Sequence, residues 1–385
     1  MKFYRIDDLP PYVFATVDQL KRELRREGRD VIDLGFGNPD IPSPETAVEK
    51  LREAALNPRN HRYSSSRGIE QLRCAVSERY RDVFGVELDP ETQIASTIGA
   101  KEGLAHLMWV LVDRGDRVVV PTPAYPIHRV APRLAGAEVV TAPAEGGIDA
   151  IEEAVRSARP RALVVSYPHN PTTAVATPED LQRLVDLARE LEFVLVHDFA
   201  YADVAFDGHR PPSVLAAEGA HECAVELYSL TKSFSMAGWR VGFVVGNAEV
   251  VAALAKLKSY LDYGTFQPIQ IAATVTLREA AEYPAEVCEL YRRRRDALID
   301  GLGLAGWPVE PPRGTMFVWA PIPEPYRDQG SLELALRLAR DAGVAVSPGI
   351  GFGAGGDGHV RFALVENEQR IRQATRAIKK LLHDH

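Results

Sequence analysis

The chain has 385 residues, 46% of them hydrophobic and 25% charged, a composition typical of globular proteins large enough for more than one domain. Lys and Arg total 45 against 53 for Asp and Glu, and the resulting net charge of −8 argues against nucleic acid or an anionic membrane as a partner. Three widely spaced cysteines without a Cys-x-x-Cys pair favour free thiols over a disulfide framework or a zinc site.

The N-terminal part of the chain predicts an arm and a helix. Residues 1–8 lack the apolar core and small-residue cleavage site of a secretory signal, and no apolar run in the sequence approaches the length of a membrane span. We therefore expect a cytoplasmic protein without a membrane partner. Residues 5–29 then predict an arm followed by a helix.

Strand-like runs alternate with helix-length amphipathic stretches through the middle of the chain, which predicts an α/β fold whose sheet is covered on both faces. The strands are expected at residues 94–98, 117–120, 138–141, 162–166, 193–197, 224–229 and 241–246. The helices are expected at residues 101–112, 126–134, 148–157 and 178–191. Thr177 is the expected N-cap of the last helix, with Pro178 at its first position.

The pattern changes after residue 283, where a second and smaller domain is expected. A long basic helix through residues 291–295 gives way to short strands at 316–320 and 344–347. The arginine run could bind nucleic acid, but acidic residues flank it at helical spacing, so a solvated helix face is the favoured interpretation. The flanking residues are Glu286, Glu289, Asp296 and Asp300.

Polar and aromatic residues directly follow several of the predicted strands. Asp198 follows one strand, and Tyr125 and Asn170 follow two others. Because open α/β sheets bind ligands at the carboxyl ends of their strands, we expect these side chains to line one pocket. If the ligand of this pocket has a pyridine ring, a carboxylate could keep the nitrogen of that ring protonated. Tyr201 would then lie near an oxygen on the ring, and Tyr125 could stack on its face. A turn or helix cap is the alternative for Asp198 taken alone.

The segment Gly99-Ala100-Lys101 ends one predicted strand and opens a helix. The unpaired N–H groups at a helix N-terminus bind phosphate readily, which makes this turn a candidate phosphate site. An ordinary glycine turn before a helix explains the motif alone equally well.

The most informative segment runs from Ser229 to Arg240 and sets Lys232 among small and apolar residues. A lysine amine attacks a carbonyl only when neutral, and desolvation or a nearby cation lowers its pKa toward that state. Ser229 and Arg240 could then bind a phosphate. This chemistry suggests pyridoxal 5'-phosphate as a cofactor, whereas the alternative for Lys232 is an ordinary solvated lysine.

The segment Gly351–Gly356 satisfies the pattern Gly-x-Gly-x-x-Gly, which occurs in dinucleotide-binding proteins. A Rossmann turn needs the pattern between a strand and a helix. Here a short strand-like run containing Arg361 follows instead, so we interpret the segment as a flexible loop and expect no nicotinamide cofactor.

Together these motifs resemble the class I and II pyridoxal-phosphate aminotransferases of fold type I, over nearly the whole chain. The residues that carry the resemblance are Gly99-Ala100-Lys101-Glu102-Gly103, Tyr125, Asn170-Pro171, Asp198, Tyr201, Ser229, Lys232 and Arg240. The resemblance implies a mostly parallel seven-stranded sheet between helices in a large domain, residues 41–283. It further implies a smaller α+β domain from residues 284–385 and part of residues 1–40, which also form the N-terminal arm.

The resemblance also assigns roles to single residues. Lys232 would hold the cofactor covalently and carry the proton between substrate and cofactor during a ping-pong exchange of an amino group between an L-amino acid and a 2-oxo acid. The remaining cofactor contacts would come from Ala100, Lys101, Tyr125, Asn170, Asp198, Tyr201, Ser229 and Arg240. Tyr63 would reach the phosphate bound by the partner subunit, which implies a homodimer with shared active sites.

Arg361 looks like the family's arginine that binds the substrate α-carboxylate through a bidentate pair. The resemblance adds Asn170 and Gly37, the latter in the glycine loop 35–40, as further substrate contacts. A surface ion pair is the alternative for Arg361, but the arginine interrupts an apolar run, which favours a buried counter-anion.

Four stretches look closest to the bacterial glutamate-pyruvate (alanine) aminotransferases, and we therefore expect alanine and 2-oxoglutarate as substrates. They are residues 9–14, 103–108, 258–266 and 346–353. The chain departs from the family pattern at Ala100, His169 and Thr173, where relatives commonly carry serine, a small residue and glycine. The alternatives are transamination of LL-diaminopimelate or another amino acid, and β-elimination from cysteine conjugates. Residues 258–266 hold no arginine for a distal carboxylate, which disfavours aspartate.

Overall fold

A seven-stranded sheet forms the centre of the larger part of the molecule. The computed structural model describes residues 1–383 except Tyr4, Asp8, Pro10 and Pro11, so part of the segment 9–14 lies outside the described residues. The strands are β2 (Ile94–Thr97), β3 (Arg117–Thr122), β4 (Glu138–Pro143), β5 (Ala162–Ser166), β6 (Val194–Asp198), β7 (Ala224–Ser229) and β8 (Gly242–Gly246). They lie in the order β2-β8-β7-β6-β5-β3-β4. Only β8 runs antiparallel to its neighbours, β2 and β7.

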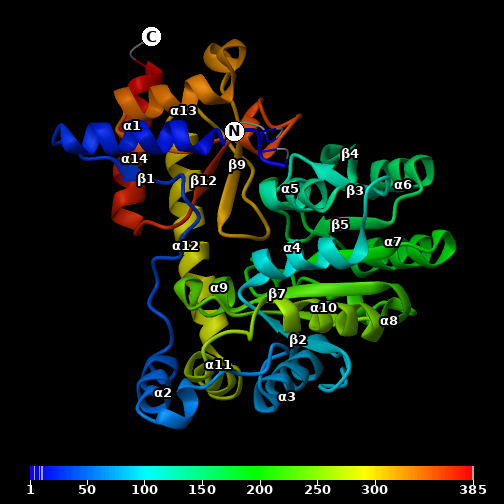
Figure 1. Cartoon of the computed structure of the whole chain (residues 1–385). Coiled ribbons are helices and arrows are strands. Elements are labelled where there is room, and N and C mark those ends of the chain that lie inside the picture. The colour runs from blue at the N-terminus through cyan, green and yellow to red at the C-terminus, as the bar shows by residue number, and fades with distance from the viewer. Residues whose placement is uncertain (4, 8, 10–11, 384–385) are drawn as a thin grey trace.

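Helices cover both faces of this sheet (Figure 1). The helices of this region are α2 (Glu45–Ala55), α3 (Glu70–Arg79), α4 (Ala100–Leu111), α5 (Pro126–Ala135), α6 (Gly147–Ala158), α7 (Pro178–Leu191), α8 (Ala220–Cys223), α9 (Leu230–Ser233), α10 (Ala248–Leu261) and α11 (Gln267–Glu279). Of these, α2 packs on α11. In β3, Val118 and Val120 pack in one core cluster with Leu104 of α4, whereas Val119 packs in another with Ile151 of α6. Strands buried on both faces are continuously apolar, which is why these runs were recognisable as strands.

The predicted elements of this region are confirmed. The seven strands and four helices lie within two residues of their expected ends. Thr177 caps α7 as expected: its side chain accepts a hydrogen bond from the Asp180 N–H at 3.1 Å, and its own N–H donates to the Asp180 carboxylate at 2.9 Å. This reciprocal capping box satisfies backbone groups that the helix leaves unpaired.

The N-terminal and C-terminal segments build a second region together. It contains α1 (Phe14–Arg26), β1 (Ile32–Asp33), α12 (Tyr283–Leu304), β9 (Phe317–Pro321), α13 (Gly330–Asp341), β10 (Val344–Ala345), β11 (Ser347–Pro348), β12 (His359–Ala363) and α14 (Glu368–His383). Figure 1 shows α1 beside α13, which also contacts α14, and Val17 of α1 shares one core cluster with Leu338 and Ile378. The domain boundaries at residues 40 and 283 stay a prediction, which this shared core supports.

Two expectations for this region are wrong in detail. The run 344–347 is two strands rather than one: β10 pairs with β1, and β11 pairs with β12 in a different sheet. The chain therefore changes sheets at Val346.

The arginine run of α12 is only partly a solvated face. Arg294 and Arg295 are 6% and 4% exposed, and they bind Asp40 and Asp207. They are buried because α12 runs from one region to the other (Figure 1), and Asp40 and Asp207 pair with them there. None of the helices in the described part of the chain is long and apolar enough to cross a membrane.

Candidate active site

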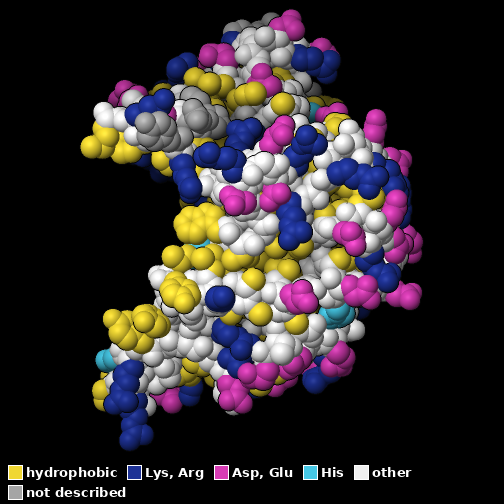
Figure 2. Space-filling model, turned by 45° about the vertical axis from the view of Figure 1, so that its right-hand side comes forward, with side chains coloured by type: hydrophobic (Ala, Val, Ile, Leu, Met, Phe, Trp, Pro, Cys, Tyr) yellow, Lys and Arg dark blue, Asp and Glu magenta, His cyan; other side chains and the backbone are white. Residues whose placement is uncertain are grey.

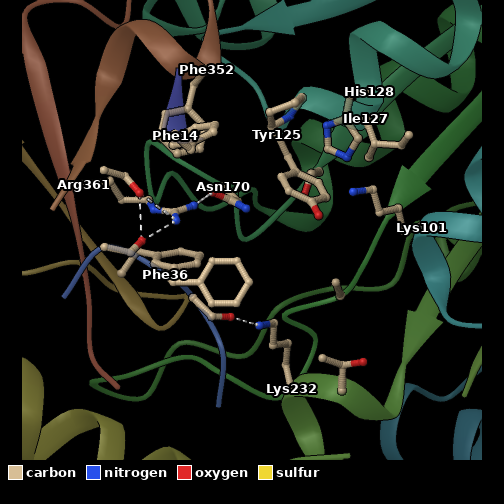
Figure 3. A pocket seen from close by; sticks show the side chains of 18 of the residues that line it. Phe14, Phe36, Lys101, Tyr125, Ile127, His128, Asn170, Lys232, Phe352 and Arg361 are labelled. Atoms are coloured by element: carbon tan, nitrogen blue, oxygen red, sulfur yellow. Dashed lines mark hydrogen bonds between the residues drawn. The ribbon is translucent and has the colours of Figure 1, made fainter. Parts of the chain in front are cut away.

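A cavity of about 410 Å³ lies at the carboxyl ends of the parallel strands. It brings together eleven of the twelve predicted site residues, and Figure 3 shows several of them converging on it from both regions. The eleven are Gly37, Ala100, Lys101, Tyr125, Asn170, Asp198, Tyr201, Ser229, Lys232, Arg240 and Arg361. The carboxyl ends of parallel strands meet at one edge of the sheet, which explains why residues so distant in sequence share one pocket.

Lys232 lies on the short helix α9, directly after β7. Its amine donates a hydrogen bond to the Gly37 carbonyl at 2.7 Å and lies 5.9 Å from the centre of the Tyr201 ring. Burial, reinforced by the positive charges of Arg361 and Arg240, lowers the pKa of Lys232 to about 7. A large fraction of the amine is therefore neutral and nucleophilic near neutral pH.

Asp198 ends β6 and is held by His128, a residue that our sequence reasoning missed. The His128 Nε2 lies 2.8 Å from Asp198 Oδ2, and the Ala200 N–H donates to Asp198 Oδ1 at 3.3 Å. His128 is 2% exposed on the first turn of α5, three residues after Tyr125. That helical spacing, which sets both side chains on one face, was the only signal in the sequence that could have identified it.

The turn from β2 to α4 approaches Arg240 closely. Gly99 has φ +80°, and a Cβ built on it would lie 2.3 Å from Arg240 Nη2, so the space beside the turn belongs to the guanidinium. The guanidinium also donates to the carbonyls of Ala237 at 3.0 Å and Ile98 at 3.4 Å. A helix N-terminus beside a guanidinium favours a phosphate group.

Ser229 stands at the same end of the pocket. Its hydroxyl accepts a hydrogen bond from the Thr231 N–H at 3.2 Å, and Thr231 lines the pocket as well, although no sequence signal singled it out. Ala100 adds no hydroxyl here, so in this turn the backbone supplies the donors.

Arg361 lies on β12 with neutral partners among the described residues. Nη1 donates to Asn170 Oδ1 at 2.7 Å, and Nη2 donates to the Gly35 carbonyl at 3.2 Å. The guanidinium carbon lies 3.8 Å and 4.6 Å from the ring centres of Phe317 and Phe352. Burial lowers the pKa of Arg361 to about 10. A carboxylate bound here would supply a counter-charge.

The glycine loop brings backbone, rather than side chains, into the pocket. A Cβ on Gly37 would lie 2.7 Å from the Phe317 ring, so the chain could not pass this close with a larger residue. The loop also carries Phe36, which is 62% exposed and stands beside the amine of Lys232 in Figure 3.

We expected the Gly-x-Gly-x-x-Gly segment to be a flexible loop, but part of it is helical. Its first residues belong to a 3₁₀ helix, Gly349–Phe352, and strand β12 follows rather than the helix that a Rossmann turn requires. Phe352 from this segment lines the pocket and packs edge-on against Phe14 at 5.0 Å between ring centres.

Two of the three departures from the family pattern lie next to Asn170. Burial, with the charge of His128 as a second cause, lowers the pKa of His169 to about 3, so its ring is neutral at physiological pH. Thr173 has φ +64°, a left-handed conformation that glycine adopts without strain.

Tyr63 is the one predicted site residue outside the pocket. It is 85% exposed, and its ring centre lies 4.7 Å from that of Tyr263. Its role toward a partner subunit stays a prediction.

Comparison with known proteins relates this geometry to known chemistry. Residues 29–378 match the family described as aminotransferase class I and II. The chain is 50% identical to the glutamate-pyruvate aminotransferase AlaC of Escherichia coli, over 99% of this chain and 93% of that protein. It is 41% identical to the LL-diaminopimelate aminotransferase of Desulforudis audaxviator, over 98% and 97% of the two chains.

Solved structures extend the similarity to the fold. A double mutant of Thermus thermophilus aspartate aminotransferase superimposes with a TM-score of 0.92 at 32% identity, covering 99% of each chain. The expected fold type I architecture is thereby confirmed.

Proposed function

Because this chain belongs to the class I and II aminotransferases, an enzyme family that uses pyridoxal phosphate, we propose that it transfers the amino group of L-alanine to 2-oxoglutarate, giving pyruvate and glutamate. The observation that carries the chemistry is a single pocket holding a lysine amine with a pKa of about 7 and a buried arginine with neutral partners. The first is suited to a carbonyl, and the second to a carboxylate.

The residues of the pocket fit pyridoxal phosphate. When bound, this cofactor supplies an aldehyde that condenses with amines and a ring that stabilises negative charge at the substrate Cα. Lys232 is the amine that would hold it, and Asp198, oriented by His128, would keep a proton on the ring nitrogen. Ser229, Arg240 and the N-terminus of α4 would bind the phosphate, since the close approach of Gly99 to Arg240 forms a cradle that a Cβ would fill.

Other side chains would orient the ring. Tyr125 and Tyr201 both line the pocket, and burial raises the pKa of each phenol, so both hydroxyls stay protonated and can donate hydrogen bonds at physiological pH. Tyr125 would stack on the ring, and Tyr201 and Asn170 would donate hydrogen bonds to its oxygen.

The proposed proton transfer belongs to Lys232. The Lys232 amine would accept the proton from the substrate Cα and later give a proton back on the cofactor side. The pKa of about 7 suits both directions, because the amine can gain and lose a proton near physiological pH. Arg361 and Asn170 would hold the substrate carboxylate during this transfer.

Alanine is the preferred donor because apolar side chains surround the carboxylate site. Phe14 and Phe352 line the pocket beside Arg361, and Phe36 lies between Arg361 and Lys232 (Figure 3), so a methyl group is well accommodated there. The 50% identity to a glutamate-pyruvate aminotransferase supports the same choice. LL-diaminopimelate is the second candidate, supported by the 41% identity to an enzyme named for it.

We further propose a homodimer. Three large aromatic side chains in the segment 260–266, Tyr260, Tyr263 and Phe266, are exposed, as is Tyr63, whose ring contacts Tyr263. Neighbouring exposed apolar side chains of this size are typical of a protein–protein interface. Figure 2 shows hydrophobic side chains gathered along a hollow at one edge of the molecule. A second copy covering such a surface would bring Tyr63 toward the partner's pocket.

A panel of amino donors tests the substrate. L-alanine, L-glutamate, L-aspartate and LL-diaminopimelate are offered with pyruvate or 2-oxoglutarate, and the 2-oxo acids formed are quantified. We expect the highest kcat/KM for alanine with 2-oxoglutarate. A higher kcat/KM for LL-diaminopimelate would replace alanine as the substrate. A cysteine conjugate is offered separately without an acceptor, and release of ammonia from it would indicate β-elimination instead.

A further inference from the structure

A fully buried lysine, Lys258 on α10, lies behind the phosphate end of the pocket. Its Nζ is 3.0 Å from Glu102 Oε1, 3.0 Å from Asp262 Oδ2 and 3.1 Å from Asp262 Oδ1. His106 lies 2.6 Å from the same Glu102 oxygen. An ammonium group buried this completely requires paired anions, and the two carboxylates supply them. The mechanism proposed above uses none of these residues.

The first carboxylate connects Lys258 to the phosphate turn. Glu102 Oε2 accepts a hydrogen bond from the Ile98 N–H at 2.8 Å, and the Ile98 carbonyl accepts a hydrogen bond from Arg240 Nη2 at 3.4 Å. Ile98 is therefore bonded to Glu102 through its N–H and to Arg240 through its carbonyl. It immediately precedes Gly99, beside which the Arg240 guanidinium lies.

The second carboxylate reaches the same arginine by another route. Asp262 Oδ1 accepts a hydrogen bond from the Gly264 N–H at 2.7 Å, which shapes the segment after α10. In the next residue, the Thr265 hydroxyl donates to the Arg240 carbonyl at 3.5 Å. One ammonium thus connects to both the side chain and the main chain of Arg240.

The charges also matter to an anionic ligand. Without Lys258, Asp262 would lose this ion pair and Glu102 would keep only His106, so the negative charge behind the site would repel a phosphate more strongly. Burial alone would raise the pKa of Glu102, but His106 and Lys258 hold it below its ordinary value, so the carboxylate remains ionised and bonded to Ile98. The oxygens of Glu102 and Asp262, with a nitrogen of His106, also lie within 4.8 Å of one another, as in a cation site. The ammonium of Lys258 meets that need for positive charge.

We propose that Lys258 is a positioning residue for the cofactor phosphate, acting through Glu102 and Asp262 on the turn before α4 and on Arg240. The proposal rests on the proposed function, since it requires that pyridoxal phosphate bind in this pocket. It concerns affinity for the phosphate group and not the chemistry at Lys232.

The test compares two ligands that differ only in the phosphate. Dissociation constants for pyridoxal phosphate and for pyridoxal are measured on the full chain freed of cofactor, for the wild type and for Lys258→Met. We expect Lys258→Met to raise the constant for pyridoxal phosphate about three- to thirtyfold and to leave that for pyridoxal unchanged. Lys258→Arg, which keeps the charge, should recover most of the affinity.

A matched control separates this role from general stability. Arg295→Met removes another buried cation, one that is 4% exposed and bound to Asp207. It should lower Tm without changing the ratio of the two dissociation constants. If Lys258→Met does not fold, Glu102→Gln is measured instead, with the same selective loss expected.

Each outcome decides between the alternatives. Equal affinities in wild type and variant, or parallel losses for both ligands, would overturn the positioning role. A wild-type chain that binds neither ligand would overturn the proposed function itself, which is a distinguishable result.

Discussion

A lysine amine reacts with an aldehyde only in its neutral form, so the pKa of Lys232 controls how fast the protein can capture a cofactor. Burial lowers that pKa most, and the guanidinium groups of Arg361 and Arg240 add to the effect. The same burial would be unfavourable for an inert lysine, whose charged form loses hydration without gaining a partner. A buried lysine with a lowered pKa is therefore typical of a reactive amine at a functional site.

The pH dependence of capture follows from this pKa. Below pH 7 the amine is protonated, so the rate of covalent attachment of pyridoxal phosphate to the cofactor-free chain should fall about tenfold for each pH unit. Above about pH 7 the rate should level off, because the pKa of Lys232 is about 7. Stopped-flow absorbance measures the rate, and Lys232→Ala serves as the blank.

A second variant checks the cause of the shift. Arg361→Gln removes one of the positive charges that lower the pKa of Lys232, so the midpoint should move to higher pH. A wild-type rate that keeps rising to pH 10 would contradict the lowered pKa.

Arg361, at the substrate end of the pocket, is likewise a buried basic residue without a charged partner among the described residues. Its described hydrogen-bond partners are neutral oxygens, and two aromatic rings flank its guanidinium. A protein carboxylate in their place would compete with the substrate. The unpaired buried charge therefore favours an incoming anion over water.

At the scale of elements, the turn between β2 and α4 decides whether the helix N-terminus can face a ligand. Gly99 takes a positive φ there and leaves room for Arg240. Any side chain would both strain the backbone and displace the guanidinium. Local backbone geometry and the charge at the site are thus linked through one residue.

Gly99→Ala tests this link, with Gly28→Ala as its control. Both glycines have φ near +80°, but a Cβ on Gly28 meets nothing within 4 Å. Both variants should lose about 1 kcal/mol of unfolding free energy to backbone strain. Only Gly99→Ala should also weaken pyridoxal phosphate binding, as measured by equilibrium titration. Equal binding by the two variants would contradict the cradle.

The strands and helices of the sheet region were predictable because the burial of each element leaves a pattern of apolar residues in its own stretch of sequence. Continuous apolar runs such as β5 read as strands, and Thr177 with Pro178 marks the start of α7. The exchange of sheets at Val346 was not predictable, since β10 and β11 form one apolar run whose partners lie elsewhere in the chain. Arg294 and Arg295 were misjudged for the same reason.

At the scale of the whole molecule, the two regions close one pocket between them. Gly37 and Arg361 come from the N-terminal and C-terminal segments, and Lys232 comes from the sheet region. The proposed dimer would add Tyr63 from a second copy. Such sharing makes activity a property of the assembly rather than of one chain.

Mixed dimers test the sharing of sites. Co-expression of Lys232→Ala with Tyr63→Ala should restore about a quarter of wild-type activity, because half of the dimers would be mixed and each would contain one intact site. Co-expression of Lys232→Ala with Asp198→Asn should restore nothing, since both residues line the same chain's pocket. Equal activity of the two mixtures, measured on purified dimers, would count against a shared site.

The sequence by itself determined the α/β class, the order of the strands along the chain and the reactive groups at their carboxyl ends, because burial on both faces and strand-end chemistry leave local patterns. Only the tertiary structure decided which distant side chains meet. His128 contacts Asp198 across 70 positions, Asn170 contacts Arg361 across 191, and Lys258 contacts Glu102 across 156. Such contacts depend on the order of strands in the sheet and on the packing of the two regions, which no local periodicity encodes.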